Sequence, residues 1–399
     1  MITTINNKHN KLNVPNLRFK EFQGEWEKTK FGDIATGFDY GMNAAAKNYD
    51  GVNKYIRITD IDEASSTYTD KDIVSPDGVL TDNYLVNNRD ILLARTGAST
   101  GKSYLYKKSD GKLYYAGFLI RANVTTHDPY FVFSQLHTHR YWRWVSIMSA
   151  RSGQPGINSQ EYSSFPIYTT SIEEESKIAK LLSLLDERIA TQNKIIDKLQ
   201  SLINGISNQL LYANNGISVL LGEILIERSE RTKENNQHEV LSSTVKGIFS
   251  QREYFSKDIA SENNVGYKII RLHDVVLSPQ NLWMGNINYN GKFDVGIVSP
   301  SYKIFSIAEG FDKEYIAATL KTHRALYNYM LVSEQGASVV RRNLNMEEFE
   351  QLVFKIPSFD QQQKIGRTIS VLNLRLELAN KQKTLYEKEK QYLLRQIFI

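Results

Sequence analysis

Apolar side chains recur at alternating spacings of four and three residues along the segment 173–211, which is the longest regular pattern in the chain. Nine of the ten recurring positions are apolar, and Gln192 is the exception. A heptad seam sustained over this length predicts one continuous helix, roughly 60 Å long at 1.5 Å per residue, that pairs with another helix. The seam consists of Ile178, Leu182, Leu185, Ile189, Gln192, Ile196, Leu199, Ile203, Ile206 and Leu210.

The pattern returns near the end of the chain, because the segment 360–398 repeats 173–211 at a constant offset of 187 residues without a gap. Lys383 and Lys390 fall on seam positions there, so the second seam is the poorer one. A helix this long needs a partner for its apolar stripe, and the sequence predicts that the two helices pair antiparallel. The second seam keeps Ile365, Ile369, Leu372, Leu376, Leu393 and Ile397.

Local signals mark the ends of the first helix. Ser171 is suited to be its N-cap, and Glu174 three residues later would complete a capping box. The run Asn214-Asn215-Gly216 is a typical helix stop.

Two globular regions with similar patterns precede these helices. After a polar arm, 1–26, the first region predicts strands at 55–58, 91–94, 104–107 and 118–123, then a helix over 129–149. The second region repeats the order, with strands near 240–243, 274–277 and 302–306 and a helix over 313–332. Each region is large enough for a binding module but small for a catalytic domain.

Short motifs are also duplicated within the globular regions. Phe31–Ile34 returns as Leu221–Ile224, and Leu136-x-Thr-His-Arg140 returns as Leu320-x-Thr-His-Arg324. The sequence therefore predicts an α+β fold with two similar mixed α/β domains, separated by a pair of long antiparallel coiled-coil helices and related by a pseudo-twofold axis. Such an object suits a target with two half-sites, of which duplex DNA is the commonest.

Composition narrows the class of protein. The chain has 399 residues, of which 41% are hydrophobic and 23% charged, as in an ordinary soluble protein. It contains 0 cysteines, which excludes a disulfide scaffold and a thiolate zinc site, and no stretch is apolar enough to span a membrane. The cytoplasm is the expected compartment. A net charge of +5 permits a polyanionic partner without requiring one.

The segment Thr96–Ser103, TGASTGKS, has features of a phosphate-binding loop and of a serine nucleophile elbow. Both motifs need a strand before them and a helix after them, and here the following residues read as a second strand. The first glycine of the phosphate-binding motif is also missing. We therefore expect a hairpin loop whose outward side chains contact phosphates and base edges, namely those of Arg95, Ser99, Thr100 and Lys102. A solvated turn without a ligand is the alternative.

The pair His137-Thr-His139 contains two residues of a type that binds metals. Side chains two residues apart on a helix diverge, and no further histidine or carboxylate is spaced to complete the site. We expect no metal, and a structural role for His139 and His323.

Polar loops of the second region mix arginine, glutamine, asparagine and aromatic residues, the types that read guanine and adenine edges. The loop Gln335–Asn343 corresponds to Arg151–Asn158 of the first region, which adds Gln154 and Asn158 to the candidates. The candidates for DNA contact in the second region are Arg231, Lys233, Lys246, Gln251, Arg252, Gln280, Asn281, Arg341 and Arg342.

These features together resemble the specificity subunit of Type I restriction-modification systems. The opening Asn16–Trp26 followed by Phe31–Ile34 is similar to that family's opening. The helix starts 174–179 and 361–366 and the helix ends 206–211 and 393–398 are similar as well. The resemblance covers essentially the whole chain.

The resemblance implies a non-catalytic subunit. Residues 1–172 and 215–358 would be target-recognition domains that each read half of a split, asymmetric DNA site. The helices 173–214 and 359–399 would set the gap and dock two methyltransferase (modification) subunits, with restriction (translocase/nuclease) subunits joining them. S-adenosylmethionine, ATP and Mg would be bound by those partner subunits, and this chain would hold no cofactor.

Two other classes of function stay open at the level of sequence. One is an enzyme built on Gly97–Ser103, and the other is a coiled-coil scaffold that binds no nucleic acid specifically. The sequence alone determines neither the recognised bases, nor the gap length, nor which loop residues meet DNA, nor the stoichiometry of a complex, nor whether the isolated chain is soluble.

Overall fold

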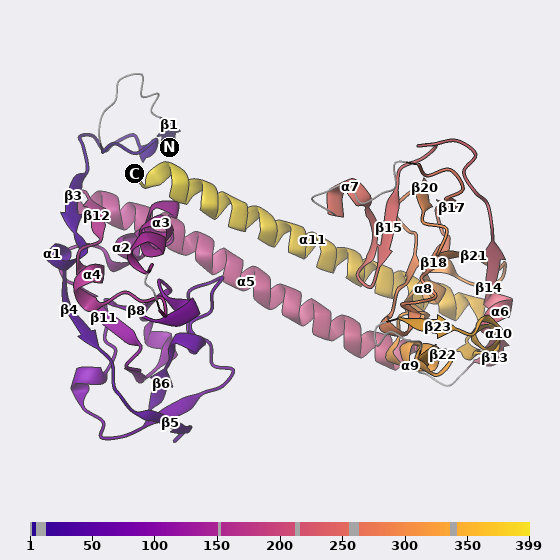
Figure 1. Ribbon diagram of the computed structural model, residues 1–399, viewed down its shortest axis with the longest axis horizontal. Helices are drawn as coiled ribbons and strands as arrows, with labels where there is room; N and C mark the ends of the chain where they lie inside the picture. Colours follow the sequence, from indigo (N-terminus) through magenta and orange to yellow (C-terminus); the bar gives the residue numbers. More distant parts are fainter. Residues whose placement is uncertain (1, 5–12, 151–152, 212–215, 255–262, 336–340) are drawn as a thin grey trace. The chain divides into compact units, whose positions relative to one another are not determined.

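The computed structural model describes residues 2–4, 13–150, 153–211, 216–254, 263–335 and 341–399 (Figure 1). The chain forms two compact units, unit 1 comprising Met1–Asn193 with Gln382–Ile399, and unit 2 comprising Lys194–Lys381. The division passes through both long helices. Each unit therefore contains the beginning of one helix and the end of the other, whereas the sequence analysis treated the helices as segments of their own.

The centre of unit 1 is an antiparallel sheet of four strands in the order β4-β11-β8-β9, that is Ala35–Tyr40, Leu119–Val124, Asp90–Ala94 and Ser103–Leu105. All five residues of β8 are buried, as its run of aliphatic side chains requires. The helices α2 (Pro129–Gln135) and α3 (His139–Met148) follow β11, and α2 packs against β8 and β9.

Unit 2 repeats this plan. Its four-stranded sheet has the order β14-β21-β18-β19, that is Leu225–Arg228, Lys303–Ile307, Val275–Leu277 and Ile287–Tyr289. The helices α8 (Lys313–Thr319) and α9 (His323–Leu331) follow β21, as α2 and α3 follow β11. The predicted strands of both regions are present, with ends displaced by one or two residues.

Smaller elements complete each unit. Those of unit 1 are β1 (Ile2–Thr4), β2 (Leu17–Phe19), β3 (Glu27–Lys30), α1 (Phe31–Ile34), β5 (Ala45–Asn48), β6 (Lys54–Ile56), η1 (Ile58–Asp60), β7 (Val74–Asp77), η2 (Asp82–Tyr84), η3 (Gly97–Ser99), η4 (Lys108–Asp110), β10 (Leu113–Tyr115), α4 (Ser159–Ser163) and β12 (Pro166–Thr169). Those of unit 2 are β13 (Ile217–Leu220), α6 (Leu221–Ile224), β15 (Leu241–Thr244), β16 (Gly247–Ser250), α7 (Gln251–Tyr254), β17 (Lys268–Arg271), η5 (Leu282–Met284), β20 (Val295–Val298), β22 (Ser333–Gln335), β23 (Arg342–Leu344), α10 (Met346–Glu350) and β24 (Val353–Ile356).

The single helices predicted over 129–149 and 313–332 are each two helices, so those predictions were wrong in one respect. Thr138 is the N-cap of α3 and its hydroxyl accepts the Tyr141 N–H, while Thr322 caps α9 through the Ala325 N–H. The duplicated Thr-His-Arg motif is therefore a helix-capping motif. His139 and His323 are exposed, and the structural residue of the motif is its threonine.

The polar arm predicted for residues 1–26 is wrong for its second half. Trp26 is buried in the core of unit 1, with its ring 5.3 Å from that of Phe131 and 6.1 Å from that of Phe398. Phe398 lies at the other end of the chain, so no local pattern could reveal this packing. Leu211, which corresponds to Phe398 in the repeat, is likewise buried in the core of unit 2.

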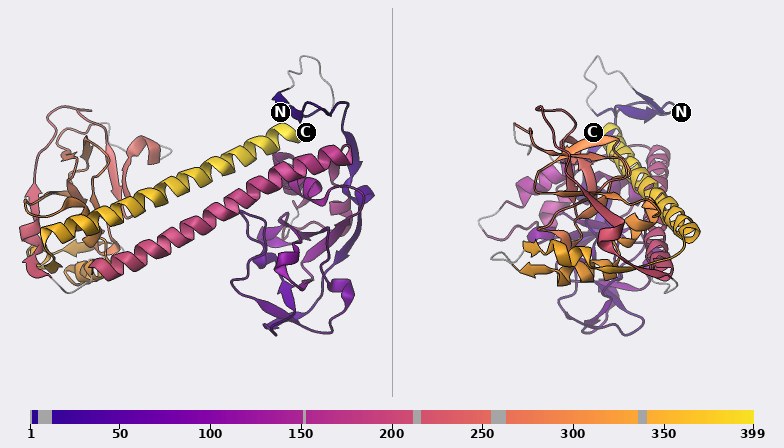
Figure 2. Two further views of the ribbon diagram at one scale, coloured as in Figure 1. Left: turned by 180° about the vertical axis from the view of Figure 1, so that it is seen from behind. Right: turned by 90° about the vertical axis from the view of Figure 1, so that its right-hand side faces the viewer.

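The two long helices are α5 (Ile172–Leu211) and α11 (Phe359–Ile397), and within each unit they lie side by side and antiparallel (Figure 2). In unit 1, Ile178, Leu182 and Leu185 share one core with Leu393 and Ile397. In unit 2, Ile365 and Ile369 pack in the core that also contains Leu211. The remaining apolar residues of the predicted seams are half-buried, and Gln192 is buried. The half-buried residues are Ile189, Ile196, Leu199, Ile203, Ile206, Leu210, Leu372 and Leu376.

Lys390, one of the two lysines on the seam, forms an ion pair that accommodates its charge. Its ammonium group lies 2.6 Å from a carboxylate oxygen of Asp186, which also accepts the hydroxyl of Tyr130. Lys383 instead pairs with Glu387 on its own helix, at 3.7 Å. The poorer second seam is thus compatible with pairing because its cations meet carboxylates.

The start of α5 differs from the predicted capping box. The Ser171 hydroxyl does accept the Glu174 N–H, as an N-cap should. The Glu174 carboxylate, however, does not return to Ser171 but accepts both Arg18 Nε and Nη2 at 2.7 Å, fully buried. The predicted stop at Asn214–Gly216 lies outside the described residues except for Gly216.

Candidate nucleic-acid interface

The loop that joins β8 to β9 is a hairpin loop, as the sequence predicted. The two strands pair antiparallel, and only the short η3 turn lies between them. Gly101 has φ +93°, and a Cβ there would lie 2.7 Å from Val145 and 3.0 Å from Trp142, so the loop rests directly on α3. Because a strand follows the loop, no helix N-terminus faces it, and neither the phosphate-binding loop nor the nucleophile elbow has its required context.

A second loop holds this hairpin loop from the side. The Gly97 N–H donates to the Pro155 carbonyl and the Ile157 N–H donates to the Arg95 carbonyl, both at 2.9 Å. Gln154 lies over Gly97 and is exposed. The structure therefore brings together two segments that the sequence analysis selected separately, 95–102 and 153–158; Arg151 and Ser152 lie outside the described residues.

The segments 95–102 and 153–158 form the first loop pair. Their predicted contact residues differ in accessibility. The Arg95 guanidinium stacks 4.5 Å from the ring of Tyr40, and Ser99 is half-buried. Thr100 was predicted to point outward and does not, because it is buried and its hydroxyl donates to the Gly97 carbonyl at 2.8 Å. Lys102 does not project freely either, since its ammonium group is paired with Glu63 at 3.2 Å.

Asn158 has a structural role that explains its duplication. Its side-chain oxygen accepts the Glu161 N–H at 2.9 Å and thereby caps α4. Asn345 caps α10 through the Glu348 N–H in the same way. The amide oxygen of Asn158 is therefore occupied by the helix cap.

Unit 2 contains an equivalent loop pair. The loop from β18 to β19 contains the turn η5 and ends at Gly285, whose φ is +93° and whose Cβ would lie 3.3 Å from Leu326 of α9. The Arg342 N–H donates to the Gln280 carbonyl at 3.1 Å, and the Arg342 guanidinium stacks 4.5 Å from the Trp283 ring. Gln280 is exposed and Asn281 half-buried. Arg341 is exposed as well.

Lys246 lies near this second loop pair. It is exposed in the turn between β15 and β16, next to Val245. The Lys321 ammonium group connects that turn to the loop, because it donates to the Gly285 carbonyl at 2.9 Å and to the Val245 carbonyl at 3.3 Å. The surrounding protein partly desolvates this ammonium group and lowers the pKa of Lys321 to about 8, although the residue as a whole is exposed.

The other predicted contact residues of unit 2 lie elsewhere on it. Arg231 donates to the Gly266 carbonyl at 2.9 Å, beside the start of β17, and Lys233 is exposed nearby in sequence. Gln251 and Arg252 belong to α7, where the Gln251 amide donates to Ser242 at 3.3 Å. No hydrogen bond or ion pair among the described residues connects these four residues to the loop pair.

Four residues at the loop pairs were not predicted from the sequence to belong to the site. They are Tyr40, Trp142, Trp283 and Lys321. Trp142 and Lys321 come from helix ends that the undivided helix prediction concealed. Trp142 is 44% exposed although it is a large aromatic residue, and that exposure is visible only in the structure. Trp283 lies two residues after the candidate Asn281, but nothing in the sequence showed that it faces an arginine.

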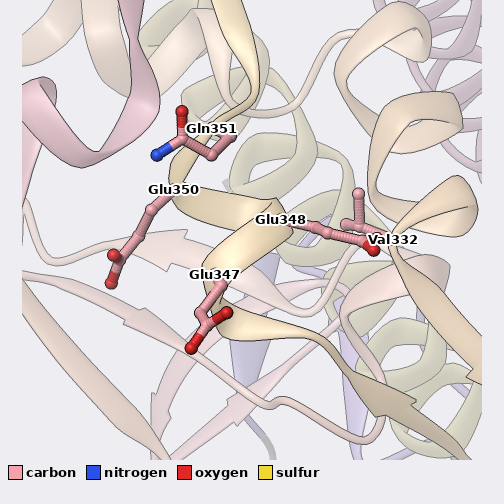
Figure 3. A pocket seen from close by; sticks show the side chains of 5 residues that line it. All are labelled: Val332, Glu347, Glu348, Glu350 and Gln351. Carbon is pink, nitrogen blue, oxygen red and sulfur yellow. The ribbon is translucent and has the colours of Figure 1, made fainter.

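A pocket of about 600 Å³ in unit 2 has the wrong charge for nucleic acid. Val332, Glu347, Glu348, Glu350 and Gln351 line it, and Figure 3 shows Glu348 extending toward Val332. Three carboxylates at one site repel phosphate. This face of α10 is therefore unsuited to DNA, which leaves the loop pair as the candidate surface.

Among the residues that the structure describes, His137 and His139 belong to no metal site. His137 is half-buried, and its two ring nitrogens lie 2.9 Å from the Phe133 carbonyl and 2.9 Å from the Ser66 hydroxyl. Burial lowers the pKa of His137 to about 4. Within the described ranges, no group of three or more potential ligands could hold a metal ion. Across the same ranges no helix combines the length and apolarity needed to cross a bilayer.

Comparison with known proteins identifies the first part of the chain. The family model described as the Type I restriction modification DNA specificity domain matches residues 23–201. Those residues belong to that family. The specificity domain so defined includes the first loop pair and most of α5.

A relative found by sequence comparison is also a specificity subunit. The specificity subunit of the Type I restriction enzyme MjaVIII from Methanocaldococcus jannaschii is 26% identical over 201 residues, which are 48% of this chain and 44% of that protein. The match thus spans less than half of the relative's own length. The resemblance inferred from the sequence motifs is confirmed.

One solved structure of a specificity subunit extends the likeness to the whole fold. The crystal structure of the Type I S subunit from M. genitalium superposes with a TM-score of 0.64 at 14% identity, covering 97% of this chain and 99% of that one. The HsdS subunit from Thermoanaerobacter tengcongensis matches with a TM-score of 0.39 at 12% identity, covering 94% and 96%. The predicted fold class is confirmed by the first of these.

Proposed function

We propose that this chain is the DNA sequence-recognition subunit of a Type I restriction-modification complex, in which each globular region reads one half of a bipartite, asymmetric site. The observation that carries the proposal is the duplicated loop pair. In both units a hairpin loop ends at a glycine of φ +93° on a helix and is held by a second polar loop. Two copies of one polar surface suit a target with two half-sites.

In this proposal the chain is not an enzyme. The loop Gly97–Ser103, on which an enzymatic alternative would depend, connects two strands of one hairpin. Its Thr100 hydroxyl is engaged by a backbone carbonyl, and its Lys102 by a carboxylate. Methylation, cleavage and translocation would then be the work of modification and restriction subunits, which would bind S-adenosylmethionine, ATP and Mg, in the cytoplasm where the DNA is.

Exposed apolar side chains on the paired helices support docking of the modification subunits. In unit 2, Ile195 and Leu202 of α5 and Val371 and Leu378 of α11 are between 42% and 54% exposed. They occupy g and c positions of the heptads, which face the same side of an antiparallel pair. Exposed apolar stripes of this kind mark protein–protein contacts, so this side of the helix pair is the proposed docking face. A coiled-coil scaffold would share this feature but would not need the loop pairs.

The test of the proposal is a region swap in the assembled complex. Residues 27–169 are replaced by the corresponding region of another specificity subunit, and methylated positions are mapped by sequencing DNA from a host that carries the complex. We expect one half-site to change and the other to stay. A swap that left both halves unchanged would contradict the modular reading, and sequence-independent methylation would favour the scaffold.

The spacing role of the helices has its own test. A matched insertion of seven residues in α5 and in α11 preserves the heptad seam and lengthens each helix by about 10 Å. At 3.4 Å per base pair, we expect the gap between the half-sites to widen by about three base pairs. An unchanged gap in an active complex would show that the helices do not set it.

A further inference from the structure

The arginines of the described chain that are buried or half-buried each make, with two exceptions, at least two hydrogen bonds of 3.2 Å or less to protein groups. Arg57 has Asp60 at 2.8 Å, Arg121 has Asp39 at 3.2 Å, and Arg228 has Asp274 at 2.8 Å. Arg18 has Glu174, and Arg89 donates to the carbonyls of Val124 and His127. Such residues are structural, since carboxylates and backbone carbonyls of the protein already hold their guanidinium groups.

Arg95 is the first exception. Its only polar contact within the described residues is a marginal one, from Nη1 to the Gly117 carbonyl at 3.5 Å. The central carbon of the guanidinium lies over the ring of Tyr40, 4.5 Å from its centroid. Tyr40 is held in turn, because its hydroxyl accepts the Ser159 N–H at 3.3 Å. The guanidinium plane is thus fixed while most of its donors remain unused.

Arg342 is the second exception, and it occupies the loop pair of the other unit. Its guanidinium lies 4.5 Å from the Trp283 ring. Nη1 reaches the Met330 carbonyl only at 3.5 Å, and Nε has no hydrogen-bond partner among the described residues. The two arginines are not equivalent in the repeat, since Arg95 lies on the hairpin loop, whereas Arg342 is the first residue of β23, whose N–H contacts the hairpin loop at Gln280. The same arrangement has therefore arisen at two different positions.

Stacking alone does not single out these residues. Arg140 also lies over aromatic rings, 4.6 Å from Tyr168 and 5.3 Å from Phe165. However, its Nη1 donates to the Pro166 carbonyl at 3.0 Å and its Nη2 to Gln135 at 3.1 Å. The Nε of Arg140, like that of Arg342, has no partner among the described residues, but the two Nη atoms of Arg140 tie β12 to α2. Among the same residues, the guanidinium groups of Arg95 and Arg342 each have only one polar contact, at 3.5 Å.

We propose that Arg95 and Arg342 each read a guanine, one in each half-site, with Tyr40 and Trp283 as the residues that position them. This inference rests on the proposed function. A planar guanidinium presents two parallel N–H donors that match O6 and N7 of guanine in the major groove, and no other base offers two acceptors there in that arrangement. Stacking on a ring reduces the loss of side-chain freedom when the contact forms.

The experiment measures the base preference of the reconstituted complex. Methylation rates are determined on duplexes in which each position of both half-sites is varied, for the wild-type complex, Arg95→Gln and Arg342→Gln. Each variant should lose guanine preference at one position of its own half-site by roughly ten- to a hundredfold. The other half-site serves as the internal control for folding and assembly.

Two further substitutions separate recognition from charge and from packing. Arg367→Gln removes an exposed cation of α11 and should leave every base preference unchanged. Tyr40→Phe keeps the ring and should preserve the guanine preference, whereas Tyr40→Ala should weaken it with little change at the other half-site. A role of Tyr40 in folding alone would lower activity on all duplexes alike.

Substituting 7-deazaguanine for the guanine in question tests the same contact without a protein variant. It should slow the wild-type complex and have no further effect on Arg95→Gln or Arg342→Gln. A split site that is still read, with unchanged preference at every position in both arginine variants, would overturn the inference and leave the proposed function intact. A wild-type complex without a bipartite preference would instead refute the proposed function.

Discussion

In each unit a side chain in the first turn of the long helix accepts a hydrogen bond from the globular region, and we call this connection the joint. The two joints have the same geometry but use different side chains. In unit 1 the Glu175 carboxylate accepts the backbone N–H of Asp128, the N-cap of α2, at 2.9 Å. In unit 2 the Gln362 side-chain oxygen accepts the N–H of Asp312, the N-cap of α8, also at 2.9 Å. Both side chains are buried. An acid and an amide thus fix one geometry between a long helix and its globular region.

The difference follows from what the neighbouring backbone offers. The Thr170 N–H donates to Glu175 at 3.1 Å, so a second acceptor oxygen is needed in unit 1. The corresponding residue in unit 2 is Pro357, which has no N–H, and its carbonyl instead accepts the Gln362 amide at 3.0 Å. A carboxylate has only acceptors, whereas an amide has one acceptor and one donor group. The backbone at each joint therefore selects the side chain.

Charge is the second difference between the joints. Glu174 is buried against Arg18, whereas its counterpart Gln361 is exposed and needs no cation. His127 Nδ1 lies 2.9 Å from Glu175, and the corresponding residue in unit 2 is Phe311. Unit 1 thus depends on buried charges at a place where unit 2 uses neutral groups, which predicts different responses to mutation and pH.

The largest effect should come from Arg18→Ala. It leaves the Glu174 carboxylate buried without its cation, which costs about 3–5 kcal/mol. Hydrogen exchange measured peptide by peptide on the full chain should show faster exchange in unit 1 and little change in unit 2. Gln361→Ala is the matched control, and we expect it to change stability by less than about 0.5 kcal/mol. Similar effects of the two substitutions would contradict the comparison.

A smaller effect is expected from Glu175→Gln, which transplants the amide of unit 2. The amide group cannot accept both backbone N–H groups, and one unsatisfied buried donor costs about 1–3 kcal/mol. Gln362→Glu, the reciprocal change, should be destabilising to a similar degree because a carboxylate cannot donate to the Pro357 carbonyl. If both substitutions were neutral in urea unfolding, backbone selection of these side chains would be wrong.

The cost of Glu175→Gln should also depend on pH. Burial raises the pKa of Glu175 above its usual value, so the folded state binds a proton more tightly than the unfolded state. The stability that this proton adds is fully present below the unfolded pKa and is lost as the pH rises through the folded one. The measured cost should therefore be larger near pH 5 than near pH 8. The measurement is repeated in a His127→Asn background, which removes the neighbouring imidazole, and a cost that rose with pH would contradict the assignment.

The capping threonines should behave alike in the two units. Thr138→Ala and Thr322→Ala each remove one hydroxyl acceptor from a helix start and should each cost about 1 kcal/mol. Thermal unfolding of the full chain, with hydrogen exchange to assign the unit, checks this expectation. A large effect at only one threonine would show that the duplicated motif has different roles in the two units.

The smallest effect is expected at the seam. Lys390→Ile places in unit 1 the residue that unit 2 has at Ile203, but it leaves Asp186 without its cation. Because the two side chains of this pair are 18% and 32% exposed, we expect a loss below about 1 kcal/mol. Adding Asp186→Asn, which copies Asn373, should recover most of the loss in a double-mutant cycle. A double variant no better than Lys390→Ile would mean that the ion pair is not what accommodates Lys390.

The features that the sequence predicted well are those with local or periodic signals. The heptad pattern located both helices, β-branched and aromatic runs located the strands, and the strand after Gly101 distinguished a hairpin loop from a phosphate-binding loop. The undivided helix 129–149 failed for a related reason. Apolar spacing continues across Thr138 because α2 and α3 pack on the same core, so periodicity could not show the break.

The sequence by itself determined the duplication, the secondary structure and the polar segments from which a recognition surface could be built, because each depends on residues close together in the chain. Only the tertiary structure decided which of these segments meet. Arg18 finds Glu174, Trp26 finds Phe398, and Arg95 finds Tyr40 across 55 to 372 positions of sequence. Burial and stacking between such distant side chains follow from packing in three dimensions. No periodic pattern in the sequence reveals these contacts.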